Sequence, residues 1–82
     1  MERVSVEYAN DGGSLLKLGN AVRARRKMLD LSQEALADAA GIDRSHMGKI
    51  ERGERNVTFL NIVRIATAMQ CSPSDLLIEA GL

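Results

Sequence analysis

The chain has 82 residues, 45% of them hydrophobic and 27% charged, which describes one small globular domain and excludes a disordered chain. No apolar run approaches the ~20 residues of a membrane-spanning helix, and a lone cysteine cannot form an internal disulfide, so we expect a cytoplasmic protein. The formal net charge is zero, yet residues 14–64 hold ten basic against six acidic side chains, which allows a basic face on a neutral protein.

Residues 1–13 are predicted to form a flexible N-terminal arm that precedes a single domain over residues 14–82. They end in the sequence NDGG, a cluster of turn-forming residues. The alternation of Val4, Val6 and Tyr8 also allows a short strand, which stays an alternative.

The first of five expected helices begins with Ser14 as its N-cap and ends near Leu29. Its apolar residues follow helical spacing, at Leu15, Leu18, Val22 and Leu29. Asp30 then turns the chain, because aspartate tolerates the left-handed backbone conformation better than most residues.

Two short helices joined by a very short turn follow. Ser32 is the expected N-cap of the second helix, and Gly41 ends it. Asp43 caps the third helix, which runs to Arg52 before Gly53 stops it. So short a joint sets the two helices at the steep angle of a helix-turn-helix unit. The inward positions are expected to be Leu36, Ala37, Ala40, Ile42, Met47 and Ile50.

The last two helices have similar start signals. Thr58 caps the fourth, whose inward face is predicted from helical spacing to hold Phe59, Ile62, Val63, Ala66 and Met69. Ser72 caps the fifth, which has Pro73 at its first position, Asp75 in the capping-box position and an end at Ala80. Five short helices with brief connections leave no room for a sheet, so we predict an all-α fold.

The run LSQEALADAAGIDRSHMGKIERGERN resembles the lambda-repressor-like (XRE-type) helix-turn-helix family, and the likeness covers roughly residues 14–77. Within that family, the DRS and IERGERNVT runs look most like the controller proteins of restriction–modification systems. The resemblance implies a compact five-helix domain that binds double-stranded DNA and acts as a sequence-specific transcriptional regulator. Asp30 and Gln70 depart from the family, which usually has a helix-ending glycine at these positions.

The resemblance also implies which residues meet DNA, with the third helix in the major groove. The base-reading positions match Arg44, Ser45 and Lys49, and the arginine could bond guanine O6 and N7 together. The positions that grip the DNA backbone match Gln33, Arg52, Arg55 and Asn56. Arg26 and Glu51 match a structural salt bridge between the first and third helices, so both are assigned to the scaffold.

Several other residues keep two interpretations. Arg23, Arg25 and Lys27 form either a solvated helix face or a set of phosphate ligands. Gly48 is expected on the solvent side of the third helix, where it either lets the helix approach DNA or is crowded by protein. Asp43 fits a helix cap better than a base reader.

A homodimer interface is expected at Leu60, Leu77 and Ile78. An exposed leucine at position 60, where the family often has a polar residue, lies on the fourth helix beside the fifth. Related proteins dimerise through this region, and a two-fold dimer would place two recognition helices ~34 Å apart on a palindromic operator. The bound dimer would control a promoter by blocking or recruiting RNA polymerase.

We expect no enzyme activity, no cofactor and no metal site. The one histidine, His46, and the one cysteine, Cys71, have no recognisable partner for a nucleophile–base pair or a metal cluster. The rival hypothesis is a helix-turn-helix module that binds a protein, such as an antitoxin, which the zero net charge keeps open. Such a module would not need a row of cations on its third helix.

Overall fold

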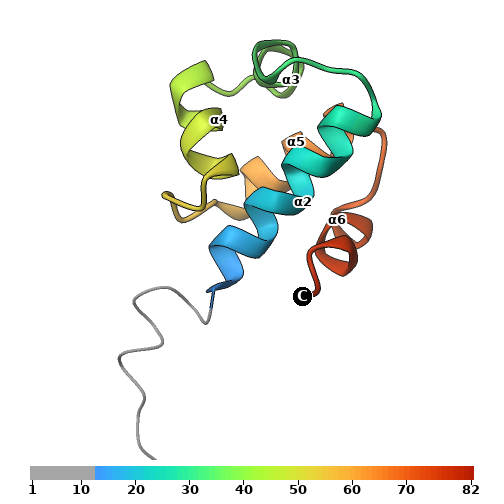
Figure 1. Ribbon diagram of the computed structural model, residues 1–82. Coiled ribbons are helices and arrows are strands. Elements are labelled where there is room, and N and C mark those ends of the chain that lie inside the picture. Colours follow the sequence, from blue (N-terminus) through green and yellow to red (C-terminus); the bar gives the residue numbers. More distant parts are fainter. Residues whose placement is uncertain (1–12) are drawn as a thin grey trace, which may run out of the picture.

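The computed structural model describes residues 13–82, so the arm predicted for residues 1–13, apart from Gly13, and the strand that was its alternative lie outside the described part. The elements are five helices: α2 Ser14–Met28, α3 Gln33–Ala40, α4 Arg44–Glu51, α5 Phe59–Ala68 and α6 Pro73–Glu79 (Figure 1). No strand occurs among residues 13–82. The predicted all-α fold is therefore confirmed, with helix ends within about one residue of those expected.

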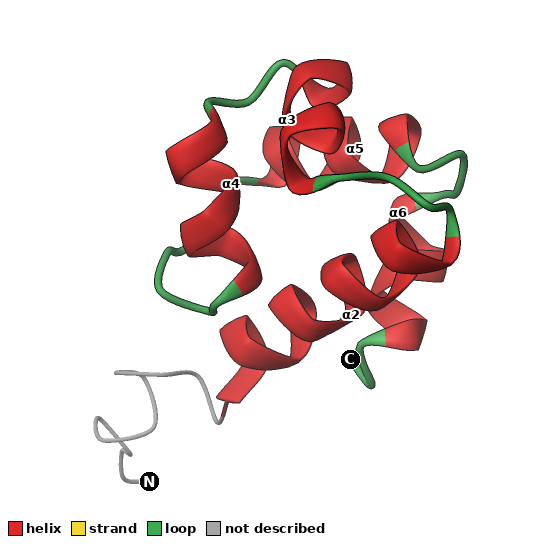
Figure 2. Ribbon diagram, turned by 45° about the horizontal axis from the view of Figure 1, so that its top comes forward, coloured by secondary structure: helices red, strands yellow, loops and turns green. Residues whose placement is uncertain are grey.

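The long helix α2 crosses the middle of the molecule, with α4 packed on one side of it and α6 on the other (Figure 1). Helix α3 lies above and contacts both α4 and α5, and α5 also packs against α6 (Figure 2). Each helix contributes to one core of aliphatic and methionine side chains, including Val22, Leu36, Met47, Ile50, Ile65, Met69 and Leu76. This core holds α3 and α4 at a fixed angle to each other.

Four of the five predicted N-caps are confirmed. The side-chain oxygens of Ser32, Asp43, Thr58 and Ser72 accept backbone N–H groups of the helices that follow them. The prediction for Ser14 is wrong, because Gly13 occupies the cap position of α2 in a left-handed conformation and makes no side-chain cap bond. Ser14 is instead the first residue of the helix.

Asp30 and Gln70 end their helices in the way that glycine usually does. Both have a left-handed backbone, with φ of 61° and 60°. After Asp30, the N–H of Leu31 bonds the carbonyl oxygen of Arg26 at 3.0 Å, and after Gln70 the N–H of Cys71 bonds that of Ala66 at 3.0 Å. These bonds close the helix ends in the manner of a Schellman motif and offset the strain of a non-glycine residue there.

The predicted inward face of α5 needs correction. Phe59, the first residue of the helix, is 71% exposed. Ile65, which the spacing did not select, is fully buried together with Ala66 and Met69. Leu29 is also more exposed than expected, since it follows the last turn of α2.

Candidate nucleic-acid interface

The joint between α3 and α4 consists of residues 41–43, and backbone geometry, hydrogen bonds and burial fix its conformation. Gly41 takes the left-handed conformation, with φ of 69°, and the N–H of Ile42 bonds the carbonyl oxygen of Ala37 at 2.9 Å. The side chains of Ile42 and Ala37 are buried. The joint therefore fixes α4 across α3 in the predicted helix-turn-helix arrangement.

Asp43 begins α4 as a cap, as predicted. Its Oδ2 atom accepts the backbone N–H groups of Ser45 at 3.1 Å and His46 at 3.3 Å, and the Ser45 hydroxyl at 2.7 Å. The Ser45 hydroxyl, followed by the N–H of His46, lowers the pKa of the Asp43 carboxyl. The cap consequently stays ionised and leaves the first turn of α4 ordered.

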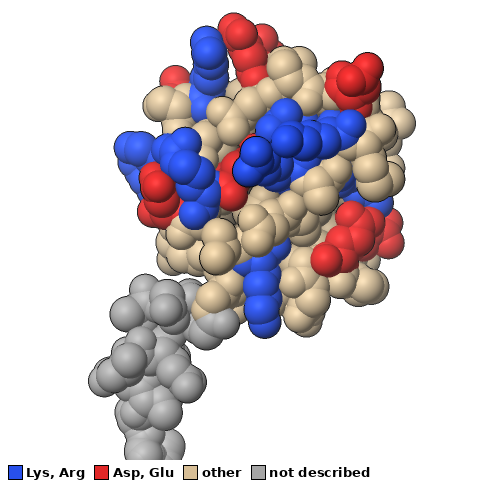
Figure 3. Space-filling model, viewed as in Figure 1, with Lys and Arg blue, Asp and Glu red and all other residues tan. Residues whose placement is uncertain are grey.

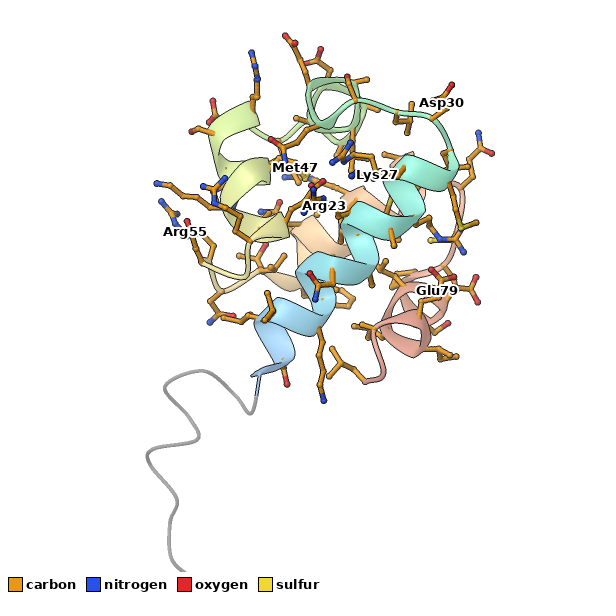
Figure 4. All side chains as sticks on the ribbon, viewed as in Figure 1. Arg23, Lys27, Asp30, Met47, Arg55 and Glu79 are labelled. Carbon is orange, nitrogen blue, oxygen red and sulfur yellow. The ribbon has the colours of Figure 1, made fainter. Side chains whose placement is uncertain are left out.

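The outward face of α4 carries most of the predicted base-reading side chains. Arg44 and Ser45 are exposed on its first turn and Lys49 is half-buried one turn later. On the opposite face, Met47 is fully buried and points from α4 into the domain (Figure 4). Ile50, one turn later, is buried as well. Helix α4 is thus held from behind by two apolar side chains while its polar side faces solvent.

Gly48 lies on the outward side but is buried, contrary to the prediction. A Cβ atom at this position would lie 3.2 Å from Nη1 of Arg52 and 3.3 Å from Oε1 of Gln33. Of the two explanations that the sequence left open, crowding by protein side chains is therefore the one that the contacts support.

Two hollows flank this side of the molecule and share Gln33 and Arg52. The larger, of about 420 Å³, lies beside the first turn of α4 and is lined by Gln33, Asp43, Arg44, Ser45, Gly48 and Arg52. The smaller, of about 240 Å³, lies between α2 and α4 and is lined by Arg23, Arg26, Gln33, Glu51 and Arg52. Basic side chains gather over α2 and the outward side of α4, with acidic ones between them (Figure 3).

Arg23 and Arg25, only two residues apart, have different roles. Arg23 lies between α2 and α4, beside the smaller hollow (Figure 4). Arg25 instead donates two hydrogen bonds to the carboxylate of Glu79 on α6, at 2.6 and 3.2 Å. Of these two arginines, Arg23 is thus the better candidate phosphate ligand.

A buried network joins the scaffold to Gln33. The guanidinium of Arg26 donates to Glu51 at 2.7 and 3.0 Å, which confirms the predicted salt bridge between α2 and α4. It also donates to the carbonyl oxygen of Leu31 at 2.9 Å. The same Glu51 accepts Nε2 of Gln33 at 3.0 Å, so the first side chain of α3 is positioned by the salt bridge.

The remaining backbone candidates lie beyond the end of α4. Arg52 donates two hydrogen bonds to Glu54, at 3.1 and 3.2 Å, and these bonds lower the pKa of the Glu54 carboxyl. Arg55 and Asn56 are exposed in the following loop, where Arg55 extends away from the domain (Figure 4). Glu54, to which the sequence analysis assigned no role at this interface, therefore partly neutralises this edge.

The three residues predicted for a dimer interface differ in exposure. Leu60, on the first turn of α5, is 60% exposed, and Ile78, on the last turn of α6, is 74% exposed. Leu77 is half-buried and packs against the core. Phe59, next to Leu60, adds a further exposed apolar side chain that the prediction had placed inside.

His46 is absent from the two hollows beside α4 described above and lines a separate one with Asn61 and Arg64. Within residues 13–82 no group of three or more histidine, cysteine, aspartate or glutamate side chains is placed to hold a metal ion. In the same part of the chain no helix is long and apolar enough to cross a membrane.

The geometry defines a helix-turn-helix domain, and comparison with known proteins agrees with it. Residues 22–76 match the helix-turn-helix family, and the chain belongs to this family. It is a DNA-binding transcription regulator of the XRE type. The predicted fold, family and regulator class are confirmed, and the protein-interaction module is not favoured.

Several of the similar proteins are control proteins or repressors. Control protein C.SmaI of Serratia marcescens is 42% identical over 65 residues, which cover 79% of this chain and 77% of that protein. The crystal structure of the restriction-modification controller protein C.AhdI from Aeromonas hydrophila superposes with a TM-score of 0.77 and 45% identity, over 78% of this chain and 97% of that one. The solution structure of the DNA-binding domain of the C2 repressor of Salmonella phage P22 superposes with a TM-score of 0.70 and 37% identity. This match covers 73% of this chain and 79% of that one.

Proposed function

We propose that this chain is a restriction–modification controller protein that binds a palindromic operator as a homodimer. Bound there, in the cytoplasm, it controls a nearby promoter by blocking or recruiting RNA polymerase. The observation that carries the proposal is the outward side of α4, where exposed Arg44 and Ser45 stand beside a hollow that also holds Gln33 and Arg52. The likeness to C.SmaI and C.AhdI supports the particular class.

In this proposal, α4 enters the major groove with its first turn toward the bases. Arg44 bonds guanine O6 and N7, and Ser45 and Lys49 contact neighbouring base edges. Gln33, Arg52, Arg55 and Asn56 contact phosphates, and Arg23 is added to them from its position between α2 and α4. Gln33 can do so because its amide has a second hydrogen besides the one given to Glu51.

Selection of random duplex DNA by the purified protein tests the proposal. We expect an enriched palindrome whose half-site centres are ~10 bp apart or a multiple of that spacing. Affinity for this site should fall by roughly 0.9 log unit per log unit of salt for each phosphate neutralised. A failure to enrich any sequence at moderate salt, with a shallow salt slope, would refute the regulator mechanism.

Replacing Arg44 by alanine should relax the preference at one base pair of each half-site. The loss of discrimination there should be roughly ten- to a hundredfold, because a bidentate contact to guanine is removed. Operator and mismatched duplexes would be compared by fluorescence anisotropy. Arg55→Ala is the matched control, since it removes the same charge from a residue assigned to phosphate and should weaken all duplexes alike. Equal, sequence-independent losses in both variants would contradict the base-reading role.

Replacing Leu60 by aspartate should shift the protein from dimer to monomer in sedimentation velocity. The new charges would face each other across a two-fold interface and lose water there, whereas the leucine is already 60% exposed in one chain and its loss leaves the core intact. Met28→Asp is the control, because Met28, the last residue of α2, is 80% exposed and is not part of the proposed interface. An unchanged dimer for Leu60→Asp would place the interface elsewhere.

A further inference from the structure

The hydroxyl of Ser45 has a fixed direction in this structure. It donates to Oδ2 of Asp43 at 2.7 Å, and the same oxygen accepts the backbone N–H groups of Ser45 and His46. A serine hydroxyl has one hydrogen to donate and two lone pairs to accept with. With the hydrogen directed at the carboxylate, only the lone pairs remain available for another molecule.

The carboxylate keeps this direction fixed at neutral pH. An ionised aspartate has no proton of its own, so the hydrogen shared by the two oxygens belongs to Ser45. The three hydrogen bonds to Asp43 lower the pKa of its carboxyl, which keeps the group ionised. A hydroxyl bond to a charged oxygen is also stronger than one to a neutral group, so the arrangement resists rotation of the hydroxyl.

From this geometry we propose that Ser45 reads the operator as a hydrogen-bond acceptor, so that its base partner is the amino group of adenine or cytosine. This deepens the proposed function and rests on it. A free serine hydroxyl can bond either a donor or an acceptor on a base edge, and so distinguishes little. Asp43 removes that ambiguity and acts as a positioning residue: Ser45 then accepts from adenine N6 or cytosine N4 and rejects the O6, N7 and O4 acceptors of guanine and thymine.

The position to be tested is the base pair of the selected operator at which Ser45→Ala loses its preference. If the contacted base is adenine, two analogues separate the possibilities: purine without the 6-amino group, and 7-deazaadenine, which keeps the amino group and lacks N7. For cytosine, the analogue without the 4-amino group serves, with 7-deazaguanine on the opposite strand as its control. Wild-type affinity should fall about five- to tenfold when the amino group is removed and stay unchanged when N7 is removed.

Three variants complete the experiment. Ser45→Ala should be insensitive to both analogues, and Ser45→Thr, which keeps a hydroxyl, should behave like the wild type. Asp43→Asn keeps an oxygen for the helix cap but holds the hydroxyl less firmly, so guanine and thymine should become tolerated at that position. This broadening separates a positioning role of Asp43 from a purely structural one, which would weaken all duplexes equally.

Sensitivity to the loss of N7 in place of the amino group would overturn the proposal, because Ser45 would then be donating. So would an Asp43→Asn variant whose preference at this position matches that of the wild type. A selection that enriches no palindrome at all is a different failure: it removes the operator itself and refutes the proposed function on which the inference rests.

Discussion

Replacing Glu51 by alanine is expected to lower the free energy of unfolding by about 3–5 kcal/mol, the usual result of leaving one partner of a buried ion pair behind. Arg26 is only 8% exposed and gives two of its bonds to this carboxylate. Gln33 loses its partner in the same variant. Urea unfolding followed by circular dichroism measures the change, and it should appear as a lower midpoint with an unaltered slope.

The chain offers a close control for this variant in Glu79→Ala. The Arg25–Glu79 pair has similar two-bond geometry, at 2.6 and 3.2 Å, but lies at the surface. Exposed ion pairs contribute little to stability because solvent screens them. The free energy of unfolding of this control should therefore be close to that of the wild type. Equal effects of the two substitutions would show that burial is not what makes the Arg26–Glu51 pair important. A double variant, Arg26→Met with Glu51→Leu, should recover much of the lost stability, since it removes both buried charges together.

The pair matters for the proposed function because it joins the scaffold to the side of the domain that we propose to face DNA. The sequence resemblance placed Glu51 in the scaffold and Gln33 on a phosphate, as separate assignments. In the structure one carboxylate bonds both Arg26 of α2 and Gln33 of α3, from its own position on α4. The three helices that build the candidate interface therefore meet at Glu51.

Local signals explain why so much of the fold was predictable. The side chain of an N-cap accepts the N–H groups of residues only two or three positions later, so the sequence alone identifies the helix starts. This holds for Ser32, Asp43, Thr58 and Ser72. The same holds for the Ser72–Asp75 capping box. For Phe59, which is 71% exposed at the start of α5, periodicity gives the wrong face, because burial depends on the neighbouring helices.

The interface was less predictable for the same reason. The sequence near Arg23 and Arg25 does not distinguish the two residues. Arg25 bonds Glu79, which lies 54 residues further along the chain, whereas Arg23 lines the hollow between α2 and α4. Gly48 likewise looks like an exposed position until Gln33 of α3 is placed beside it. Long-range packing decides these cases, and sequence spacing does not contain it.

Replacing Gly19, a buried residue of α2, by alanine is the second change from which we expect a large effect. It should lower the free energy of unfolding, whereas a glycine-to-alanine change within a helix usually raises it. In a free helix this change stabilises by about 1 kcal/mol. Here a Cβ atom would lie 2.5 Å from the carbonyl oxygens of both Ile50 and Glu51, and 2.8 Å from the carbonyl carbon of Glu51. These are backbone atoms, which cannot move aside without shifting the end of α4. Overpacking of this kind costs about 1–3 kcal/mol, so we expect a net loss of stability in urea unfolding.

Gly48→Ala is the matched control, because it makes the same change at a second buried helical glycine. The atoms nearest to its new Cβ are the flexible ends of Arg52 and Gln33, at 3.2 and 3.3 Å, which can yield. The urea concentration at the midpoint of unfolding should therefore be equal to or higher than that of the wild type. Gly19→Ala should also weaken operator binding more than its stability loss alone explains, since the displaced α4 carries Arg44 and Ser45 with it. Unaltered stability in Gly19→Ala would mean that the close approach of α2 and α4 does not set the position of the recognition helix.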